Sequence, residues 1–163
     1  MTRHEILIQQ EEMLWFEHFT NEDGWDLGCH IREKIRQSGY EMSVCIRMNH
    51  GYTVFQYGTN GTGLSYQGWM HRKIHTAQVM GMSSLQAAVF SEEAGMSLTE
   101  MNLNETDDLL RGGGFPIRVK GVGLVGAAAV SGLHPDMDHS FLVDCLASYL
   151  GVDHVPRLDE ADG

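Results

Sequence analysis

Glycine residues are concentrated between Arg111 and Leu133, and this stretch constrains the fold more than any other part of the chain. It holds seven of the nineteen glycines, and short segments of β-branched or small apolar residues separate them. Glycine lets the backbone adopt a positive φ or come close to another group, so such a cluster is typical of tight turns and close contacts. We therefore expect another group to lie close to this backbone.

Two structures are compatible with the stretch. The segment Gly121–Gly126 matches the G-x-G-x-x-G pattern of a dinucleotide-binding turn and follows the strand-like segment Ile117–Lys120. A turn of that kind opens a helix of about 10–15 residues, whereas Pro135 and the Ser-Gly pair before it stop a helix after about one turn. The alternative is a β-hairpin of Phe115–Val119 and Val122–Val130, whose small residues let helices pack closely on the sheet. The sequence favours the hairpin.

Helical and strand-like patterns alternate along the rest of the chain. Apolar spacing and capping residues predict helices over residues 3–15, 21–37, 66–80, 83–93 and 135–150. Strict alternation predicts a second hairpin with strands at 43–49 and 52–57. We expect an extended link at 16–20 and an irregular segment at 96–111. This order implies a single α/β domain of the α+β type over residues 1–155, with a mostly antiparallel sheet flanked by helices, and an acidic flexible tail at 156–163.

The composition argues against several classes of protein. A net charge of -11 and a pI near 5.1 do not suit a nucleic-acid-binding surface, which needs clustered Lys and Arg. The three cysteines are odd in number and show no C-x-x-C spacing, which indicates reduced thiols. No apolar run approaches the ~20 residues that span a bilayer, and the first residues do not resemble a signal peptide. We expect a cytoplasmic protein with no nucleic-acid or membrane partner.

Four blocks of sequence are characteristic when they occur together and in this order. They are Thr20–Gly28, Trp69–Lys73, Gly113–Ile117, and Gly126–Leu133 followed by Asp138 and His139. Together they resemble the haem-degrading-domain family (HbpS/GlcG-like), and within it the uncharacterised small cytoplasmic branch. The resemblance extends over about residues 14–150. It implies a layered α/β domain with an antiparallel sheet of about five strands and assembly into a homo-oligomer. Some members of the family bind or degrade haem, and many have no established activity.

Two histidines, His71 and His75, stand one helical turn apart with Arg72 and Lys73 between them. This spacing lets two imidazoles face the same ion, and His139 could supply a third ligand. The alternatives are an ordinary surface helix, or a role in haem or anion binding in which a histidine ligates the iron and the two cations hold the propionates. The H-E-x-x-H pattern is absent, and we assign no metal site.

The glycine-rich stretch supplies the other half of the candidate site. Gly113 and Gly114, just before Phe115, either expose N–H groups as an anion nest or turn the chain at a subunit contact. Asp138 suits the positive end of a helix dipole, and in a functional interpretation it orients a pocket histidine. We expect a ligand pocket between the helix of residues 66–80 and the hairpin, and we include in it Ser131, Asp138 and His139.

The sequence favours two functions. The first is a small cytoplasmic protein that binds haem or another tetrapyrrole, with weak haem degradation as an activity to test, and this function follows mainly from the resemblance. The second is a non-enzymatic homo-oligomeric scaffold or adaptor that uses the apolar and glycine-rich surfaces for self-assembly. A binder of another small metabolite is a third alternative. No nucleophile elbow, phosphate-binding loop or carboxylate pair compels a catalytic function.

Overall fold

The glycine-rich stretch forms a β-hairpin at the centre of the domain. In the computed structural model, which describes residues 1–162, β3 (Gly114–Val119) and β4 (Gly123–Ser131) pair antiparallel. Strand β4 also pairs antiparallel with β1 (Ser43–Met48), and β1 with β2 (Thr53–Gly58), so the strand order is β2-β1-β4-β3. The G-x-G-x-x-G segment lies in the turn of the hairpin and in β4, and no helix follows it directly. The hairpin interpretation is confirmed.

The sheet is antiparallel and flanked by helices, as expected, but it has four strands instead of about five. The difference lies at the edge beside β3. There the extended link makes a single parallel bridge, between Phe16 and Val119, before α2 begins. One bridge leaves the link outside the ladder, so no fifth strand forms.

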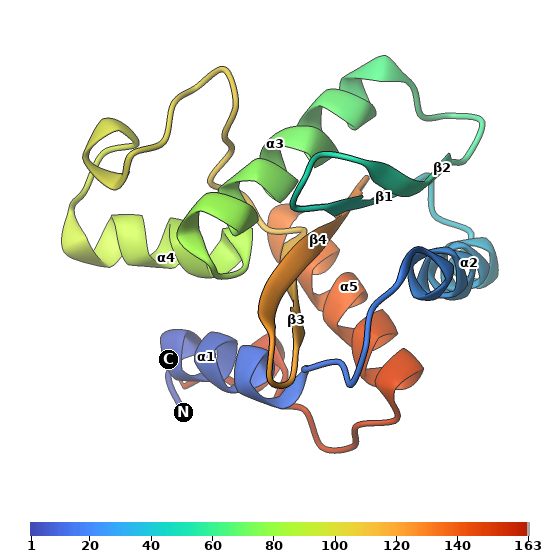
Figure 1. The fold of residues 1–163 in the computed structure, drawn as a ribbon. Helices are drawn as coiled ribbons and strands as arrows, with labels where there is room; N and C mark the ends of the chain where they lie inside the picture. The colour runs from blue at the N-terminus through green and yellow to red at the C-terminus, as the bar shows by residue number, and fades with distance from the viewer. Residues whose placement is uncertain (163) are drawn as a thin grey trace.

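Helices cover both faces of the sheet (Figure 1). On one face, α2 (Asn21–Ser38) and α5 (Pro135–Leu150) form the main core with the sheet; it includes Leu27, Ile31, Val44, Val130 and Leu142. On the other, α3 (Leu64–Met80) packs its Met70, Ile74 and Ala77 against small residues of β1 and β4. Alternation along each strand separates the two cores, because successive side chains point to opposite faces.

Small residues in β4 allow this close packing. Ala127 and Ala129 are fully buried under α3. A Cβ on Gly126 would lie 2.6 Å from the carbonyl oxygen of Arg47 on the neighbouring strand. Such a distance is far inside van der Waals contact, so a side chain cannot be added there without moving the backbone. The close contact expected of the glycine-rich stretch is therefore with the protein's own strands and helices.

The remaining elements pack around this sandwich. Helix α1 (Arg3–Met13) lies against α4 (Ser84–Ala94), which follows α3 after the turn at Gly81. A short 3₁₀ helix, Thr99–Met101, interrupts the irregular segment before β3. After α5 the chain returns along α1, where the Gln10 amide donates to the carbonyl of Pro156 and a second 3₁₀ helix spans Leu158–Glu160. Within residues 1–162 no helix is both long and apolar enough to cross a membrane.

Candidate functional site

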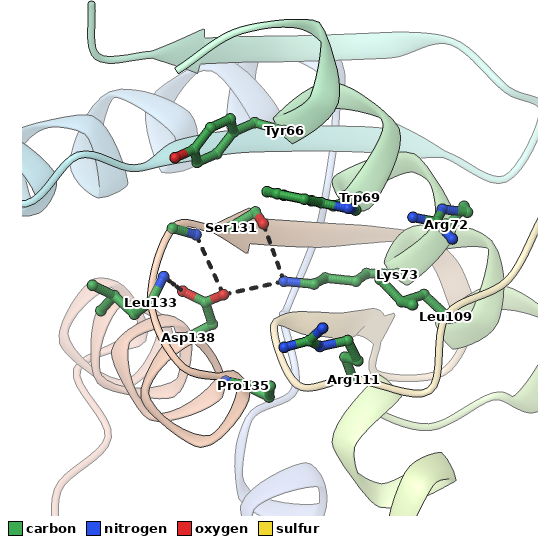
Figure 2. Close-up of a pocket in the computed structure, with 11 residues that line it drawn as sticks. Tyr66, Trp69, Arg72, Lys73, Leu109, Arg111, Ser131, Leu133, Pro135 and Asp138 are labelled. Carbon is green, nitrogen blue, oxygen red and sulfur yellow. Dashed lines mark hydrogen bonds and ion pairs between the residues drawn. The ribbon is translucent and has the colours of Figure 1, made fainter. Parts of the chain in front are cut away.

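A pocket of about 400 Å³ opens between α3, the end of β4 and the first turn of α5 (Figure 2). This volume lies within the range of roughly 300–1,000 Å³ that is usual for small-molecule sites. Helix α3 contributes Tyr66, Trp69, Arg72 and Lys73 to its wall. The other lining residues come from the segment before β3, from the end of β4, from the link after it and from the first turn of α5: Leu109, Arg111, Ser131, Gly132, Leu133, Pro135 and Asp138.

A buried ion pair forms the innermost part of the pocket. The Lys73 Nζ atom lies 3.1 Å from Oδ2 of Asp138, and the two side chains are only 4% and 2% exposed. The same ammonium group donates to the carbonyl of Val130 at 3.0 Å and to the Ser131 hydroxyl at 3.4 Å. Asp138 also accepts from the backbone N–H groups of Leu133 and Gly132, at 2.9 and 3.4 Å. Helix α3, strand β4 and helix α5 thus meet at one pair of charges.

Burial moves both members of this pair toward their neutral forms. Loss of solvation lowers the pKa of Lys73, and Arg111 nearby lowers it further, while the attraction of Asp138 opposes both effects. Loss of solvation raises the pKa of Asp138 against the opposing attraction of Lys73. The free energy needed to move a proton from Nζ of Lys73 to Oδ2 of Asp138 is therefore smaller than for the same transfer in water.

Glycines make room for Lys73. A Cβ on Gly113 would lie 2.8 Å from Lys73 Nζ, and a Cβ on Gly114 would lie 2.7 Å from the Lys73 carbonyl oxygen. Gly113 also has a φ of +126°, which other residues rarely adopt. The N–H of Gly114 donates to the Ser84 hydroxyl at 2.9 Å. Phe115, the next residue, is buried in the main core.

The candidate histidines lie outside the pocket. His75 Nδ1 donates to Oδ1 of Asp108 at 2.7 Å, and Asp108 is fully buried at the end of the segment that leads to β3. Nε2 of His71 is buried without a hydrogen-bond partner, and burial followed by the charge of Arg47 lowers the pKa of this imidazole. Among residues 1–162 no group of three or more His, Cys, Asp or Glu side chains is arranged to hold a metal ion.

His139 is buried on the opposite side of the hairpin from α3. Its Nε2 lies 2.7 Å from the Gln10 side-chain oxygen, and burial lowers the pKa of the imidazole to about 3. It is therefore a neutral donor at physiological pH. Asp138 contacts Lys73 and not this neighbouring histidine. Of the residues expected in the site, the structure brings Arg72, Lys73, Ser131 and Asp138 together in the pocket wall.

Seven of the eleven lining residues were not expected from the sequence, and three of these carry aromatic or charged side chains, namely Tyr66, Trp69 and Arg111. Arg72 and Arg111 are the notable pair, because no carboxylate of residues 1–162 lies within ion-pairing distance of either guanidinium. With Lys73 the wall carries three cations and one carboxylate, Asp138, in a chain whose net charge is -11. The signals available in the sequence were the position of Arg111 directly before the glycine run and the place of Trp69 in the block Trp69–Lys73.

Fold and pocket together define a small α/β domain whose pocket has an aromatic side and an excess of positive charge. The model of the family described as "Haem degrading protein HbpS-like" matches residues 19–147. A UPF0303 protein of Yersinia enterocolitica is 33% identical over 145 residues, which cover 88% of this chain and 86% of that protein. The chain therefore belongs to the HbpS-like family, and the resemblance noted in the sequence is confirmed.

Solved structures share the fold. The crystal structure of Ybr137w superposes with a TM-score of 0.82 at 23% identity, and the match covers 91% of this chain and 87% of the Ybr137w chain. The crystal structure of HbpS superposes with a TM-score of 0.67 at 23% identity, covering 82% and 91% of the two chains. The structure of a PduOC–haem complex also has a TM-score of 0.67, at 20% identity, and covers 80% and 94%. At these identities the comparison establishes the α/β architecture of the chain.

Proposed function

We propose that this protein binds haem or a related tetrapyrrole in the pocket beside α3. The observation that carries the proposal is the pair of arginines, Arg72 and Arg111, which face the same pocket without a carboxylate partner in the described chain. Planar guanidinium groups recognise carboxylates by paired charge-assisted hydrogen bonds, and the propionates of a tetrapyrrole are such carboxylates. Membership of a family described as haem-degrading and the haem complex of PduOC, which has the same fold, support the choice of ligand.

The pocket residues fit such a ligand. Trp69 offers an indole surface on which an aromatic macrocycle can stack, and it is 40% exposed although it is a large apolar side chain. The phenol of Tyr66 belongs to the small set of side chains that ligate haem iron in proteins, and its ring packs edge-on against Trp69 with the centroids 5.2 Å apart. In this proposal Tyr66 holds the iron and the arginines hold the propionates. Bound haem would supply a redox-active iron, and weak haem degradation is part of the proposal.

A haemin titration followed in the Soret region tests this function. Wild-type protein should give a saturable shift with a fixed stoichiometry, and Arg111→Gln and Arg72→Gln should each weaken binding about tenfold, the equivalent of one lost charge-assisted hydrogen bond. Arg36→Gln is the matched control, because Arg36 lies on α2 and pairs with Glu33. Tyr66→Phe should alter the position of the Soret band with a smaller change in affinity. Non-saturating binding, or equal binding by Arg36→Gln and both pocket variants, would refute the site.

A homo-oligomeric scaffold is the second candidate, favoured by one observation. Strand β2 is an open edge of the sheet, and Leu64, which begins α3 just after it, is 85% exposed. An exposed edge strand beside an apolar side chain is a common place for another chain to pair. Light scattering on wild-type protein and on Leu64→Glu tests this proposal. A larger particle that dissociates in the variant supports assembly through this edge, and a wild-type monomer refutes it.

A further inference from the structure

The three lysines of the chain have very different environments. Lys120 is 60% exposed and pairs with Glu17 at the surface, and Lys34 is half-buried on α2. The ammonium group of Lys73 instead lies in the wall of a pocket, almost fully enclosed, beside a buried carboxylate (Figure 2). A structural ion pair does not need a pocket above it, and a buried lysine is the usual form of a lysine that reacts with a carbonyl group.

We propose that the pocket accepts a small carboxylate with an adjacent aldehyde or ketone, a 2-oxo acid, and that the amine of Lys73 condenses with its carbonyl to form an imine. This assigns a covalent ligand site to Lys73. It goes beyond the binding of a tetrapyrrole and does not depend on it, because it uses the innermost part of the pocket and needs no iron.

Asp138 supplies the proton acceptor that an attacking amine requires. Its Oδ2 lies 3.1 Å from Nζ of Lys73, so one proton can pass between them without movement of the backbone. The two backbone N–H groups of Leu133 and Gly132 hold the carboxyl group in that orientation. The direction of the pKa shifts described above, toward a neutral amine and a neutral acid, favours the same transfer.

Arg111 supplies the partner for the carboxylate of the ligand. It lines the same pocket as Lys73 and lies close enough for its charge to lower the pKa of that amine. Arg72, one residue before Lys73 on α3, adds a second cation. A 2-oxo acid places its carboxylate on the carbon next to the carbonyl, so a cation beside the reactive amine is what such a ligand requires.

The reaction balances without any further reagent. Asp138 takes one proton from the Lys73 ammonium, and the nitrogen lone pair attacks the carbonyl carbon while the C=O π electrons move to oxygen. That oxygen takes the proton from Asp138, and the nitrogen passes one of its own protons to the same carboxylate. The lone pair then forms the C=N bond as the hydroxyl leaves with that proton as water. The products are a protonated imine, a carboxylate at Asp138 and one water, with no oxidation or reduction.

Reductive trapping with pyruvate tests the inference on the wild-type protein. Pyruvate and cyanoborohydride are added without haem, and peptide mass spectrometry measures N-(1-carboxyethyl) groups on each lysine over a range of pyruvate concentrations. We expect Lys73 to be modified first and to saturate with pyruvate, while Lys34, Lys120 and the amino terminus react slowly and in proportion to concentration. Modification confined to those other amines would overturn the proposal, because a buried lysine without a site reacts last.

Three comparisons make the test specific. Arg111→Gln should raise the pyruvate concentration for half-maximal Lys73 modification about tenfold, the loss expected for one charged hydrogen bond, and should leave Lys120 modification unchanged. Acetone has the carbonyl without the carboxylate and should not saturate Lys73 in the same concentration range. Lactate has the carboxylate without the carbonyl and should compete with pyruvate for the site. Equal labelling of Arg111→Gln and wild type would refute the carboxylate site. The measurement does not involve haem, so its failure is distinct from failure of the Soret titration.

Discussion

The buried pair of Lys73 and Asp138 allows a quantitative prediction about stability. Lys73→Met keeps the aliphatic stem of the lysine and removes the charge, so the packing of α3 against Gly113 and Gly114 is largely preserved. Asp138 then remains 2% exposed with only the backbone N–H groups of Leu133 and Gly132 as partners. Removal of one member of a buried ion pair costs about 3–5 kcal/mol. Because two hydrogen bonds to the carboxylate remain, we expect a loss near the lower limit, about 3 kcal/mol at pH 7.

The same variant should respond to pH in a definite direction. Without Lys73 the buried Asp138 loses the attraction that opposed its desolvation, so its pKa rises further above the unfolded value. A group with a raised folded pKa stabilises the fold when it is protonated, and this contribution is lost as the pH rises through the folded pKa. The deficit of Lys73→Met relative to wild type should therefore be largest at pH 7 and shrink as the pH falls toward 5.

Urea unfolding followed by tryptophan fluorescence at several pH values measures both effects. The double variant Lys73→Met with Asp138→Asn removes the unpaired charge and should lose less stability than the sum of the two single variants. Lys120→Met, which breaks an exposed pair, serves as the control and should unfold at the wild-type midpoint. If Lys73→Met unfolds like wild type at pH 7, or if its deficit does not change with pH, the pair does not carry the energy derived from its burial.

Three further predictions follow from other buried groups. The pKa of His139 is about 3 in the fold, below its usual value of 6.5, so its contribution to stability is present above pH 6.5. That contribution declines by up to about 1.4 kcal/mol per pH unit as the pH falls. Urea titrations should show this slope in wild type and lose it in His139→Gln. Gly113→Ala places a Cβ 2.6 Å from the Val130 carbonyl oxygen at a φ of +126°. It should lower the free energy of unfolding by about 2 kcal/mol or more in thermal or urea melts. Gly63→Ala is the control and should change this free energy little, because Gly63 has open space around it and an extended backbone. Burial raises the pKa of the Cys45 and Cys145 thiols to about 11 and about 12, while Cys29 is exposed. A thiol-reactive dye should therefore modify one cysteine in the native protein and three after denaturation. Rapid reaction of all three cysteines in the native protein would contradict this packing.

The sequence predicted the fold well where local patterns and packing requirements agree. Alternating residues in β1 and the run of small residues in β4 indicated two antiparallel hairpins, and both exist. The capping residues Thr20 and Ser83 begin helices as expected, and Gly39 ends α2 with a left-handed φ. The sheet has one strand fewer than expected because the link at residues 16–20 makes a single bridge to β3, and no local sequence pattern specifies how many bridges a link makes.

The site was predicted less completely than the fold. Residues Lys73 and Asp138 are 65 positions apart, and nothing in the sequence indicates that their side chains meet. Helical spacing placed His71 and His75 on neighbouring turns correctly, but it cannot tell which side of α3 faces the pocket. Arg111 belongs to an irregular segment, so its direction depends on tertiary contacts alone. Aromatic and arginine residues near glycine-rich turns were the signals available, and they indicate a site only after the fold is known.

Asp108 anchors the segment before β3 to α3, so the chain can vary in length just before this residue without loss of the pocket. Its carboxylate contacts His75, the Thr76 hydroxyl and the N–H of Asn104, and Leu109 donates to the same Thr76 hydroxyl. These bonds fix the chain to α3 three residues before Arg111, while residues 104–107 are exposed. Insertions or deletions at these exposed positions break the turn bonds of Asn104 and change the loop entropy slightly, but they leave the contacts of Asp108 with α3, and so Arg111, in place. Related sequences should therefore be aligned here on the aspartate that precedes the glycine run, with gaps placed on its amino-terminal side.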